Sequence, residues 1–472
     1  MSASPSQPPA PQVTAGDLRA AGRTPACPFR IQMDDGSDLF FAQPLRVLPG
    51  KRVVGRAMWN GIPVLAKLFI AEESARHWER ERKGILALGQ AGLPTPPLLT
   101  AGRLAKGGHY LLTRYLDPAS PLDTREDTLK DWLCPVADLL GHMHAHGLLQ
   151  TDPHLSNFLL HDGRLFLIDG DGVRTYRAGD QRAPRRNLAL FLAQLPIRQA
   201  GRHAEAIDAY RRAFPAAAID PKELAAEVHE ARAERLRDYL TKSVRDCGQF
   251  QVERTFNRFT AVVRSEIERL APILRDPDAW MARGVTLKKG NTSTVARIAV
   301  DGGEVVIKRY NIKGLIHAIS RFWRPSRAWH SWREGHRLSL LGIPTPAPLA
   351  LIEQRFGPLR GKAWLITAYS SGPNLLQIWT QTALPPPNEM RALREILHAL
   401  DEARISHGDM KASNLIWLSR GIALIDLDSM KQHSSQASFS RARKRDMRRL
   451  LKNWPRASPL RDALASTFKA WL

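Results

Sequence analysis

The chain has 472 residues and carries 69 Lys and Arg against 46 Asp and Glu, a formal net charge of +23. Its three cysteines lie far apart, which argues against a disulfide framework and against a structural zinc site. No apolar run reaches the roughly 18–20 residues that a membrane-spanning helix needs. The excess of cations favours a polyanionic partner, and we predict no nucleic acid, because no zinc-finger, helix-turn-helix or RNA-recognition motif accompanies it.

The first 70 residues are expected to hold a tail and a small sheet. Residues 1–35 begin MSASPSQPPAPQVTAGD, which is rich in Pro and Ser and lacks the cationic start and apolar core of a secretory signal. We therefore predict a disordered tail there. Residues 37–70 alternate apolar and polar side chains between the turns PGK and NGIP, which predicts an antiparallel sheet. Its last strand, PVLAKLF, contains Lys67.

Helices are expected next. Residues 74–92 read as a helix closed by a glycine, and residues 126–147 as a second helix. Residues 185–275 have helical character throughout, so 201–280 is predicted to be a helical extension of a first domain and a bridge to a second. The second domain begins with strands that flank DGG, a tight hairpin signal, and the strand VVIKRY contains Lys308.

One loop pattern occurs twice, as QTDPHLSNFLLHDGRLFLIDGD and as HGDMKASNLIWLSRGIALIDLD. In each copy an Asp is followed five residues later by an Asn, and twelve residues after that by an Asp behind an apolar strand. These residues are Asp152, Asn157 and Asp169 in the first copy, and Asp409, Asn414 and Asp426 in the second. Phosphoryl transfer uses such a trio: the first Asp orients the attacking hydroxyl, while the Asn and the last Asp hold Mg²⁺ against the nucleotide phosphates.

Other segments repeat in the same order around this pattern. They include the strand lysines Lys67 and Lys308, GLPTP (92–96) and GIPTP (342–346), and RAPRRNLALFLAQLP (182–196) and RARKRDMRRLLKNWP (441–455). An isolated D-x4-N-x12-D pattern is weak, but segments that repeat in one order indicate two homologous domains.

At these residues the chain resembles the lipopolysaccharide core kinases of Gram-negative bacteria, the heptose and Kdo kinases, which have a protein-kinase-like fold. The resemblance implies an α+β fold with two tandem kinase-like domains, 36–200 and 281–472, each with a small antiparallel β N-lobe and a helical C-lobe. It implies a cytoplasmic enzyme that uses ATP and Mg²⁺ to phosphorylate a sugar hydroxyl of nascent lipopolysaccharide core or another anionic glycolipid. No oligomeric state is predicted.

The resemblance also assigns the remaining site residues. Lys67 and Lys308 would contact the nucleotide phosphates, and Glu81 would orient Lys67. Equivalent spacing in the second domain reaches Ser331, so Glu334, one helical turn later, is the predicted partner of Lys308.

Two departures accompany these assignments. The first copy has QTD where the second has HGD, so it loses a His, His407 in the second copy, that can brace the loop. Asp171 and Asp428 lie two residues after the metal-binding Asp in each copy. They would either assist the metal or cap the strand end, and we favour the cap.

Residues 313–327 form a predicted basic amphipathic helix, which is typical of a membrane interface. Its apolar face would hold Leu315, Ile316, Ile319, Phe322 and Trp323, and its cations would be Lys313, Arg321, Arg324 and Arg327. We therefore predict peripheral contact with the anionic inner face of the inner membrane. The alternative is that this face packs on the N-lobe core. The basic run 441–452 is interpreted as a solvated helix face.

Three alternative functions stay open. A non-catalytic pseudokinase scaffold in envelope assembly would not need the complete Lys, Asp, Asn and Asp sets. A small-molecule phosphotransferase of the aminoglycoside type would favour an acidic acceptor pocket, whereas the net charge of +23 favours an anionic acceptor. A protein kinase would carry an APE-type segment and a long activation loop. Neither follows Asp169 or Asp426 in this sequence.

Overall fold

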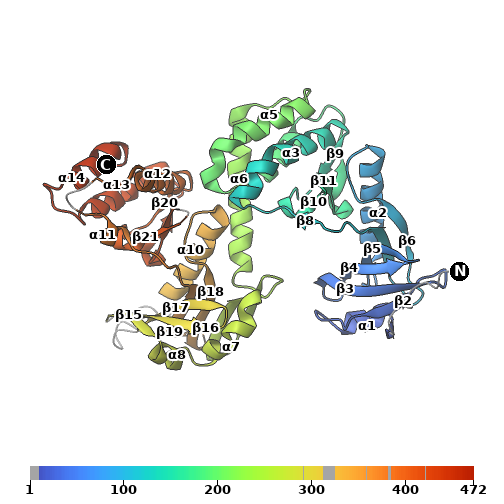
Figure 1. Ribbon diagram of the computed structural model, residues 1–472, viewed down its shortest axis with the longest axis horizontal. Helices are drawn as coiled ribbons and strands as arrows, with labels where there is room; N and C mark the ends of the chain where they lie inside the picture. Colours follow the sequence, from blue (N-terminus) through green and yellow to red (C-terminus); the bar gives the residue numbers. More distant parts are fainter. Residues whose placement is uncertain (1–9, 291, 312–324, 358, 381–383, 420) are drawn as a thin grey trace. The chain divides into compact units, whose positions relative to one another are not determined.

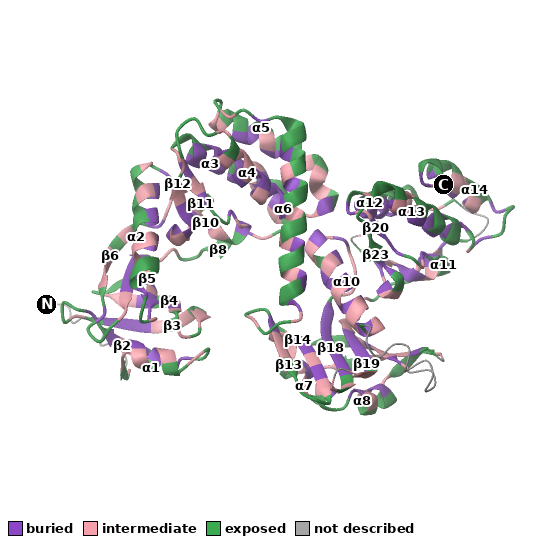
Figure 2. Cartoon of the chain, turned by 180° about the vertical axis from the view of Figure 1, so that it is seen from behind, coloured by how far each residue is buried: buried purple, intermediate pink, exposed green. Residues whose placement is uncertain are grey.

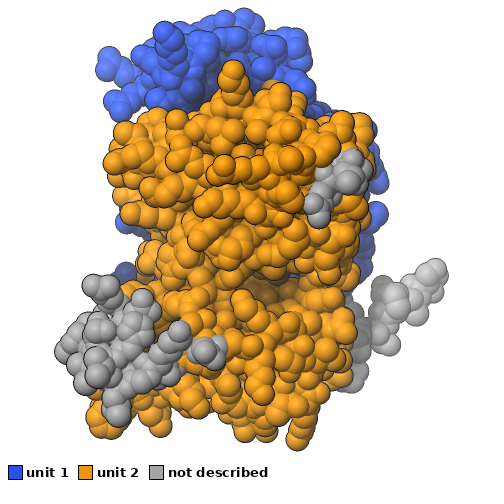
Figure 3. Space-filling model, turned by 90° about the vertical axis from the view of Figure 1, so that its left-hand side faces the viewer, with its two compact units in different colours: residues 1–194, 202–231 blue, residues 195–201, 232–472 orange. Residues whose placement is uncertain are grey.

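The computed structural model describes residues 10–290, 292–311, 325–357, 359–380, 384–419 and 421–472. The chain forms two compact units, coloured separately in Figure 3. Unit 1 comprises residues 1–194 and 202–231, and unit 2 comprises residues 195–201 and 232–472. Each unit contains one seven-stranded sheet, called its N-lobe here, and a group of helices, called its C-lobe.

The sheet of unit 1 has the strand order β1-β2-β3-β4-β5-β7-β6 (Figure 1). Its strands are β1 (Gln12–Val13), β2 (Phe29–Gln32), β3 (Asp38–Leu48), β4 (Arg52–Trp59), β5 (Ile62–Phe69), β6 (Leu98–Arg103) and β7 (His109–Arg114). All neighbours are antiparallel except β1 and β2. The sheet predicted over 37–70 is therefore present as β3, β4 and β5.

The N-terminal segment is ordered where the structure describes it, so the prediction of a disordered tail over 1–35 is wrong for residues 10–35. Helix α1 (Ala15–Ala20) begins with a capping box between Thr14 and Asp17. Strand β2 buries Phe29 and Ile31, and the Phe29 ring stacks on Phe41 of β3 at 4.6 Å. These apolar side chains gain a buried partner that the Pro- and Ser-rich composition of the segment did not indicate.

The two faces of this sheet are covered by different helices. Val64, Ala66 and Leu68 of β5 join the core that also contains the buried side chains of α1. Because side chains alternate along a strand, Lys67 points to the opposite face, where it meets helix α2 (Ala75–Gln90).

The C-lobe of unit 1 combines helices with short hairpins. Its helices are α3 (Glu126–Ala145), α4 (Arg182–Leu192), α5 (His203–Ala213) and the first part of α6 (Pro221–Lys242). Strands β8 (Ser120–Pro121), β9 (Leu148–Gln150), β10 (Phe158–His161), β11 (Arg164–Leu167) and β12 (Val173–Thr175) frame the loop that carries Asp152.

The sheet of unit 2 is antiparallel throughout, in the order β13-β14-β18-β19-β17-β16-β15. Its strands are β13 (Phe250–Arg254), β14 (Arg258–Val263), β15 (Val285–Lys289), β16 (Ser293–Val300), β17 (Gly303–Tyr310), β18 (Pro348–Phe356) and β19 (Leu359–Ala368). In Figure 2 the central strand β18 is mostly in the buried colour. The predicted α+β class is confirmed.

Strands β13 and β14 correct the prediction that 201–280 is a helical bridge. Helix α6 ends at Lys242, and residues 250–263 form a hairpin at the edge of the unit 2 sheet. Phe250, Phe259 and Ala261 are buried in its core, so the hairpin is stabilised by tertiary contacts. Unit 2 therefore begins near residue 232 and not at 281.

Helices cover both faces of this sheet as well. Helices α7 (Ile267–Arg275) and α8 (Pro277–Arg283) pack on the face that holds Ile307. Helix α10 (Arg327–Leu341) packs on the other face, where Trp332 contacts the ring of Phe250. Lys308 lies one residue after Ile307 and therefore points to the α10 side.

The C-lobe of unit 2 contains helices α11 (Leu375–Ile378), α12 (Pro387–Glu402), α13 (Gln436–Leu451) and α14 (Pro459–Thr467). Strands β20 (Ile405–Ser406), β21 (Leu415–Leu418), β22 (Gly421–Leu424) and β23 (Lys431–Gln432) frame the loop that carries Asp409. Its apolar core also includes Ile197, which the segment 195–201 contributes from between two parts of unit 1.

Within the described part of the chain, no helix combines the length and the apolar character that a membrane crossing requires. The predicted membrane helix 313–327 lies outside the described residues except for its last three positions.

Candidate active site

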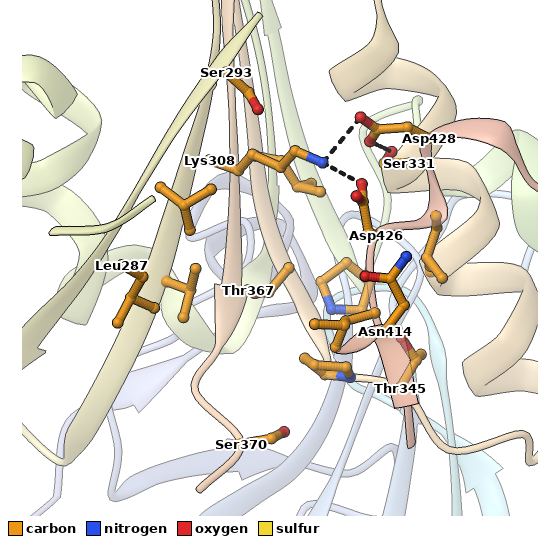
Figure 4. Close-up of a pocket in the computed structure, with 18 of the residues that line it drawn as sticks. Leu287, Ser293, Lys308, Ser331, Thr345, Thr367, Ser370, Asn414, Asp426 and Asp428 are labelled. Carbon is orange, nitrogen blue, oxygen red and sulfur yellow. Dashed lines mark hydrogen bonds and ion pairs between the residues drawn. The ribbon is translucent and has the colours of Figure 1, made fainter. Parts of the chain in front are cut away.

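Strand β17 and the end of β22 bring Lys308 and Asp426 together, although 118 residues separate them in sequence. The Lys308 Nζ donates to Asp426 Oδ1 at 2.6 Å and to Asp428 Oδ2 at 2.9 Å (Figure 4). The structure thus joins the predicted strand lysine to the predicted metal-binding Asp within one unit.

These side chains face a cavity of about 480 Å³ between the two lobes of unit 2. Strands β15 and β16 contribute Leu287 and Ser293 to its wall, and β19 contributes Thr367 (Figure 4). Asn414 and Asp426 line the opposite side. A mostly apolar cavity of this size with a few converging polar groups is typical of a small-molecule or cofactor site.

Asn414 and Asp426 are arranged to offer oxygen ligands. The Asn414 side chain donates from Nδ2 to the Asp409 carbonyl at 2.9 Å, which directs its donors into the loop and leaves Oδ1 as its ligand atom. Asp426 adopts a left-handed backbone conformation with φ of 60°. That conformation is strained for a non-glycine residue, and such backbone strain is often found at functional sites. An amide oxygen and one carboxylate suit Mg²⁺, whose remaining ligands are usually phosphates and water.

Unit 1 repeats this geometry. Asn157 Nδ2 donates to the Asp152 carbonyl at 2.9 Å, and Asp169 has φ of 72°. Burial and the neighbouring Glu81 carboxylate raise the pKa of Asp169, which favours a cation beside it.

Two cations hold the predicted catalytic carboxylate of unit 2. Lys411 Nζ lies 3.1 Å from Asp409 Oδ2, and Arg449 Nη1 lies 3.1 Å from Asp409 Oδ1. Arg449, on α13, also donates to the Gly408 carbonyl at 2.8 Å. The equivalent positions in unit 1 are occupied by His154 and Leu190, so only unit 2 places an arginine there.

The same loop is anchored from below by Asp446, a residue that the sequence analysis missed. Its carboxylate accepts from the backbone N–H of His407 at 2.7 Å and of Gly408 at 2.9 Å. Burial lowers the pKa of His407, so the ring is neutral; its Nε2 pairs with the Ile425 carbonyl at 3.0 Å. Asp446 is the one acidic residue inside the basic run 441–452, and that contrast is the signal that was available.

In unit 1, Gln150 replaces His407. Its Nε2 donates to the carbonyls of Ile168 at 3.3 Å and Asp169 at 3.1 Å, so it fixes the strand end at Asp169 as the His does at Ile425. Asn187, at the position of Asp446, donates to the Gln150 carbonyl at 2.6 Å. The first copy thus lacks the His, as its QTD triplet shows, but Gln150 braces the loop in its place.

Unit 1 contains the predicted ion pair of Lys67 and Glu81. Glu81 is fully buried, and its carboxylate accepts from the backbone N–H of Gly170 and of Asp171, each at 3.1 Å. Burial alone would raise the pKa of Glu81, but the charges of Lys67 and Arg52 outweigh it and lower that pKa.

Unit 2 has a different arrangement, and the prediction that Glu334 orients Lys308 is wrong. The Glu334 carboxylate accepts from Arg337 Nε at 2.9 Å. The position equivalent to Glu81 is Ser331, whose short side chain donates to Asp428 Oδ1 at 2.7 Å. Asp428 is thus a contact of Lys308 and not only the strand cap that the sequence suggested.

Comparison with known proteins gives one family match, and it falls in unit 2. Residues 278–467, which lie wholly in unit 2, match the sequence profile of the family described as lipopolysaccharide kinase (Kdo/WaaP). Among curated proteins, no match was found. Solved structures that are similar include one titled "WaaP in complex with acyl carrier protein". It is 22% identical, covers 42% of this chain and 86% of its own, and has a TM-score of 0.31.

Proposed function

We propose that unit 2 transfers the γ-phosphoryl group of ATP to a sugar hydroxyl of the lipopolysaccharide inner core, since its residues 278–467 match the lipopolysaccharide kinase (Kdo/WaaP) family. The family is one of ATP-dependent kinases that act in lipopolysaccharide core biosynthesis. The observation that carries the proposal is the convergence of Lys308, Asn414 and Asp426 on one cavity.

The residues fit an ATP–Mg²⁺ complex. Lys308 supplies a cation for the phosphates, while Asn414 and Asp426 supply oxygen ligands for the metal. When bound, the metal and the nucleotide would supply the transferable phosphoryl group and neutralise the charge that develops on it. The side chains of unit 2 contribute positioning and charge, which is the larger part of catalysis in phosphoryl transfer.

Asp409 would accept the hydrogen bond of the attacking hydroxyl and orient its oxygen. Asp446 and His407 keep the loop in place, so that the Asp409 carboxylate is held before any acceptor arrives. A preorganised carboxylate avoids the entropic cost of ordering the loop during the reaction.

The surroundings of Asp409 favour an anionic acceptor. Lys411 and Arg449 place two positive charges beside its single negative charge. Exposed cations continue along the same helix, α13, at Lys444, Arg445 and Arg448. Phosphate and carboxylate groups of a lipopolysaccharide core or another anionic glycolipid would be attracted there, whereas a cationic aminoglycoside would be repelled.

We infer that unit 1 is a second kinase-like copy that binds nucleotide through Lys67, Glu81, Asn157 and Asp169, with Asp152 as its candidate base. The paired lysine and the shared loop geometry support this. Unit 1 has Leu190 at the position of Arg449, and this difference favours unit 2 as the main site of turnover.

We also propose that the protein acts on the inner, cytoplasmic face of the inner membrane by peripheral contact. Among the cations of the predicted membrane helix, Arg327 lies within the described residues, and it pairs with Asp428 beside the candidate site. The described residues also offer an apolar contact. Phe256 and Phe356 are 64% and 69% exposed at the turns of two hairpins of unit 2, and their ring centroids lie 4.9 Å apart. Aromatic rings at such tips are suited to a membrane interface.

The main proposal is tested by phosphate transfer to purified core oligosaccharide. Wild-type protein with Mg·ATP should add phosphate to core isolated from a strain that lacks this gene, as detected by mass spectrometry. Asp409→Asn should lose that transfer. Phosphorylation of a protein or of an aminoglycoside in place of the core would reject the proposed acceptor.

A further inference from the structure

The two units can be aligned through their sheets. Lys67 pairs with Val54 of the neighbouring strand, and Lys308 pairs with Val295 in the same way. The GLPTP and GIPTP segments then align helix α2 with helix α10. Residues at equivalent positions around the two lysines can therefore be compared directly.

Three positions around the lysine differ together. Glu81 of unit 1 is replaced by Ser331 in unit 2, Phe69 is replaced by Tyr310, and Arg52 is replaced by Ser293. Unit 2 thus loses the helix carboxylate and a nearby arginine, and gains three hydroxyl groups around its lysine.

Both of the new hydroxyl groups at Tyr310 and Ser331 are used by Asp428. Each donates to Asp428 Oδ1 at 2.7 Å. Asp428 Oδ2 accepts from Lys308 and from Arg327. The carboxylate is 6% exposed, and two donors reach each of its oxygens. A buried carboxylate is tolerated only when it is paired and hydrogen-bonded in this way.

The equivalent carboxylate in unit 1 has another role. Asp171 pairs with Arg80 at 2.7 Å and with His77 at 3.1 Å, and Lys67 is held by Glu81 instead. In unit 2 the helix position holds the uncharged Ser331, which donates to Asp428, and the carboxylate beside Lys308 comes from Asp428.

From this geometry we propose that Asp428 is the positioning residue for Lys308 in unit 2, supported by Ser331 and Tyr310, and that it replaces the helix carboxylate used in unit 1. The inference rests on the proposed nucleotide site of unit 2. Asp428 acts through Lys308 and need not contact the nucleotide itself.

The test uses the full-length chain with Lys67→Ala, so that unit 1 does not contribute nucleotide binding. Calorimetry with Mg·ATP is carried out on Lys308→Ala, Asp428→Asn and Glu334→Gln. Asp428→Asn should weaken binding about tenfold, because a charge-assisted contact that holds the lysine is lost. It should lower kcat about 100-fold, because the lysine is misplaced. Glu334→Gln, on the same helix, should stay within about twofold of wild type, since its carboxylate pairs with Arg337.

A rescue variant separates positioning from general destabilisation. Tyr310→Phe and Ser331→Glu install the residues of unit 1 at these two positions. Added to Asp428→Asn, they should recover at least about tenfold of the lost kcat. Tyr310→Phe with Ser331→Ala keeps the carboxylate and removes two of its donors. That pair should weaken Mg·ATP binding about fivefold and provides the test if Asp428→Asn does not fold.

The outcomes are distinguishable. Weaker binding in Asp428→Asn together with rescue supports the inference. If Lys308→Ala weakens binding while Asp428→Asn, or the Tyr310 and Ser331 pair, binds like wild type, the inference is overturned and the nucleotide site stands. If Lys308→Ala itself binds like wild type, the proposed nucleotide site is rejected, and the inference with it.

Discussion

Gln150 and His407 fix the same strand end in their respective units, the first by donating to the Ile168 carbonyl and the second by pairing with the Ile425 carbonyl. Different side chains thus brace the same loop. A QTD triplet in place of HGD is therefore compatible with an ordered catalytic loop in unit 1.

Nucleotide binding should depend on Lys308 and Asp426. Lys308→Ala removes the cation for the phosphates, and Asp426→Ala removes a metal ligand, so each should weaken Mg·ATP binding by about tenfold or more. Calorimetry in the presence and absence of Mg²⁺ measures this, with the exposed Arg441→Ala as the control. Unchanged affinity in both variants would contradict the site assignment.

Asp409→Asn and Asp152→Asn test which unit turns over. Asp409→Asn should keep nucleotide affinity but lower kcat by about 100-fold or more, because the group that orients the hydroxyl is lost. Asp152→Asn should have a smaller effect on core phosphorylation. Residual transfer in the double variant that equals wild type would exclude the proposed mechanism.

Asp446→Ala should weaken unit 2 and its catalysis. The change leaves two backbone N–H groups at His407 and Gly408 without their acceptor, at a cost of about 1–3 kcal/mol in the free energy of unfolding. Because the loop also loses its anchor, kcat should fall more than KM for Mg·ATP rises. Urea unfolding and steady-state kinetics measure the two effects. A variant that is destabilised but has normal kcat would show that Asp446 is only a fold residue.

Acid should destabilise unit 1 through His144. Burial lowers the pKa of His144 to about 4, below its ordinary value near 6.5. The unfolded state then binds more protons between these values, so the free energy of unfolding should fall as the pH drops through this window. The loss approaches about 3 kcal/mol at its lower end. Urea unfolding from pH 7 to pH 4.5 should show a shallower pH slope in His144→Gln. The exposed His142→Gln, on the same helix, should keep the wild-type slope.

The exposed aromatic pair should contribute to membrane contact. Phe256→Ser with Phe356→Ser should reduce flotation of the protein with anionic vesicles, because two rings no longer enter the interface. Binding of wild type should also weaken with salt, as expected for cations at an anionic surface. Leu45→Ser, 54% exposed in unit 1, is the control. Equal flotation of all three proteins would place the contact elsewhere.

Much of the candidate site could be predicted because its sequence pattern is repeated. The order of Lys308, Asp409, Asn414 and Asp426 along the chain is shared by the two copies, and the kinase-like resemblance assigns each a role. The structure brings Lys308 to Asp426, and places Asn414 against the Asp409 loop. That unit 1 is itself a kinase-like domain stays a prediction, since the family match covers unit 2.

The partner of Lys308 could not be predicted from spacing. Glu334 lies one helical turn after the position expected for the acidic partner, and Asp428 lies two residues after Asp426. Only the three-dimensional arrangement shows which of these carboxylates reaches Lys308. Strands β13 and β14 were missed for a related reason. Short apolar runs between helical segments do not distinguish strand from helix, and this hairpin is stabilised by its pairing with β18, almost 100 residues later.

The segment 195–201 is synthesised long before the rest of the core into which it packs. Ile197 emerges from the ribosome between two parts of unit 1, yet its apolar partners in the core of unit 2 include Leu338 and Ile343, which are made more than 140 residues later. Unit 1 can gather all of its own chain once residue 231 has been synthesised, while Ile197 must wait for unit 2. Separating the units by a single cut would therefore always leave one of them with a missing or a foreign segment.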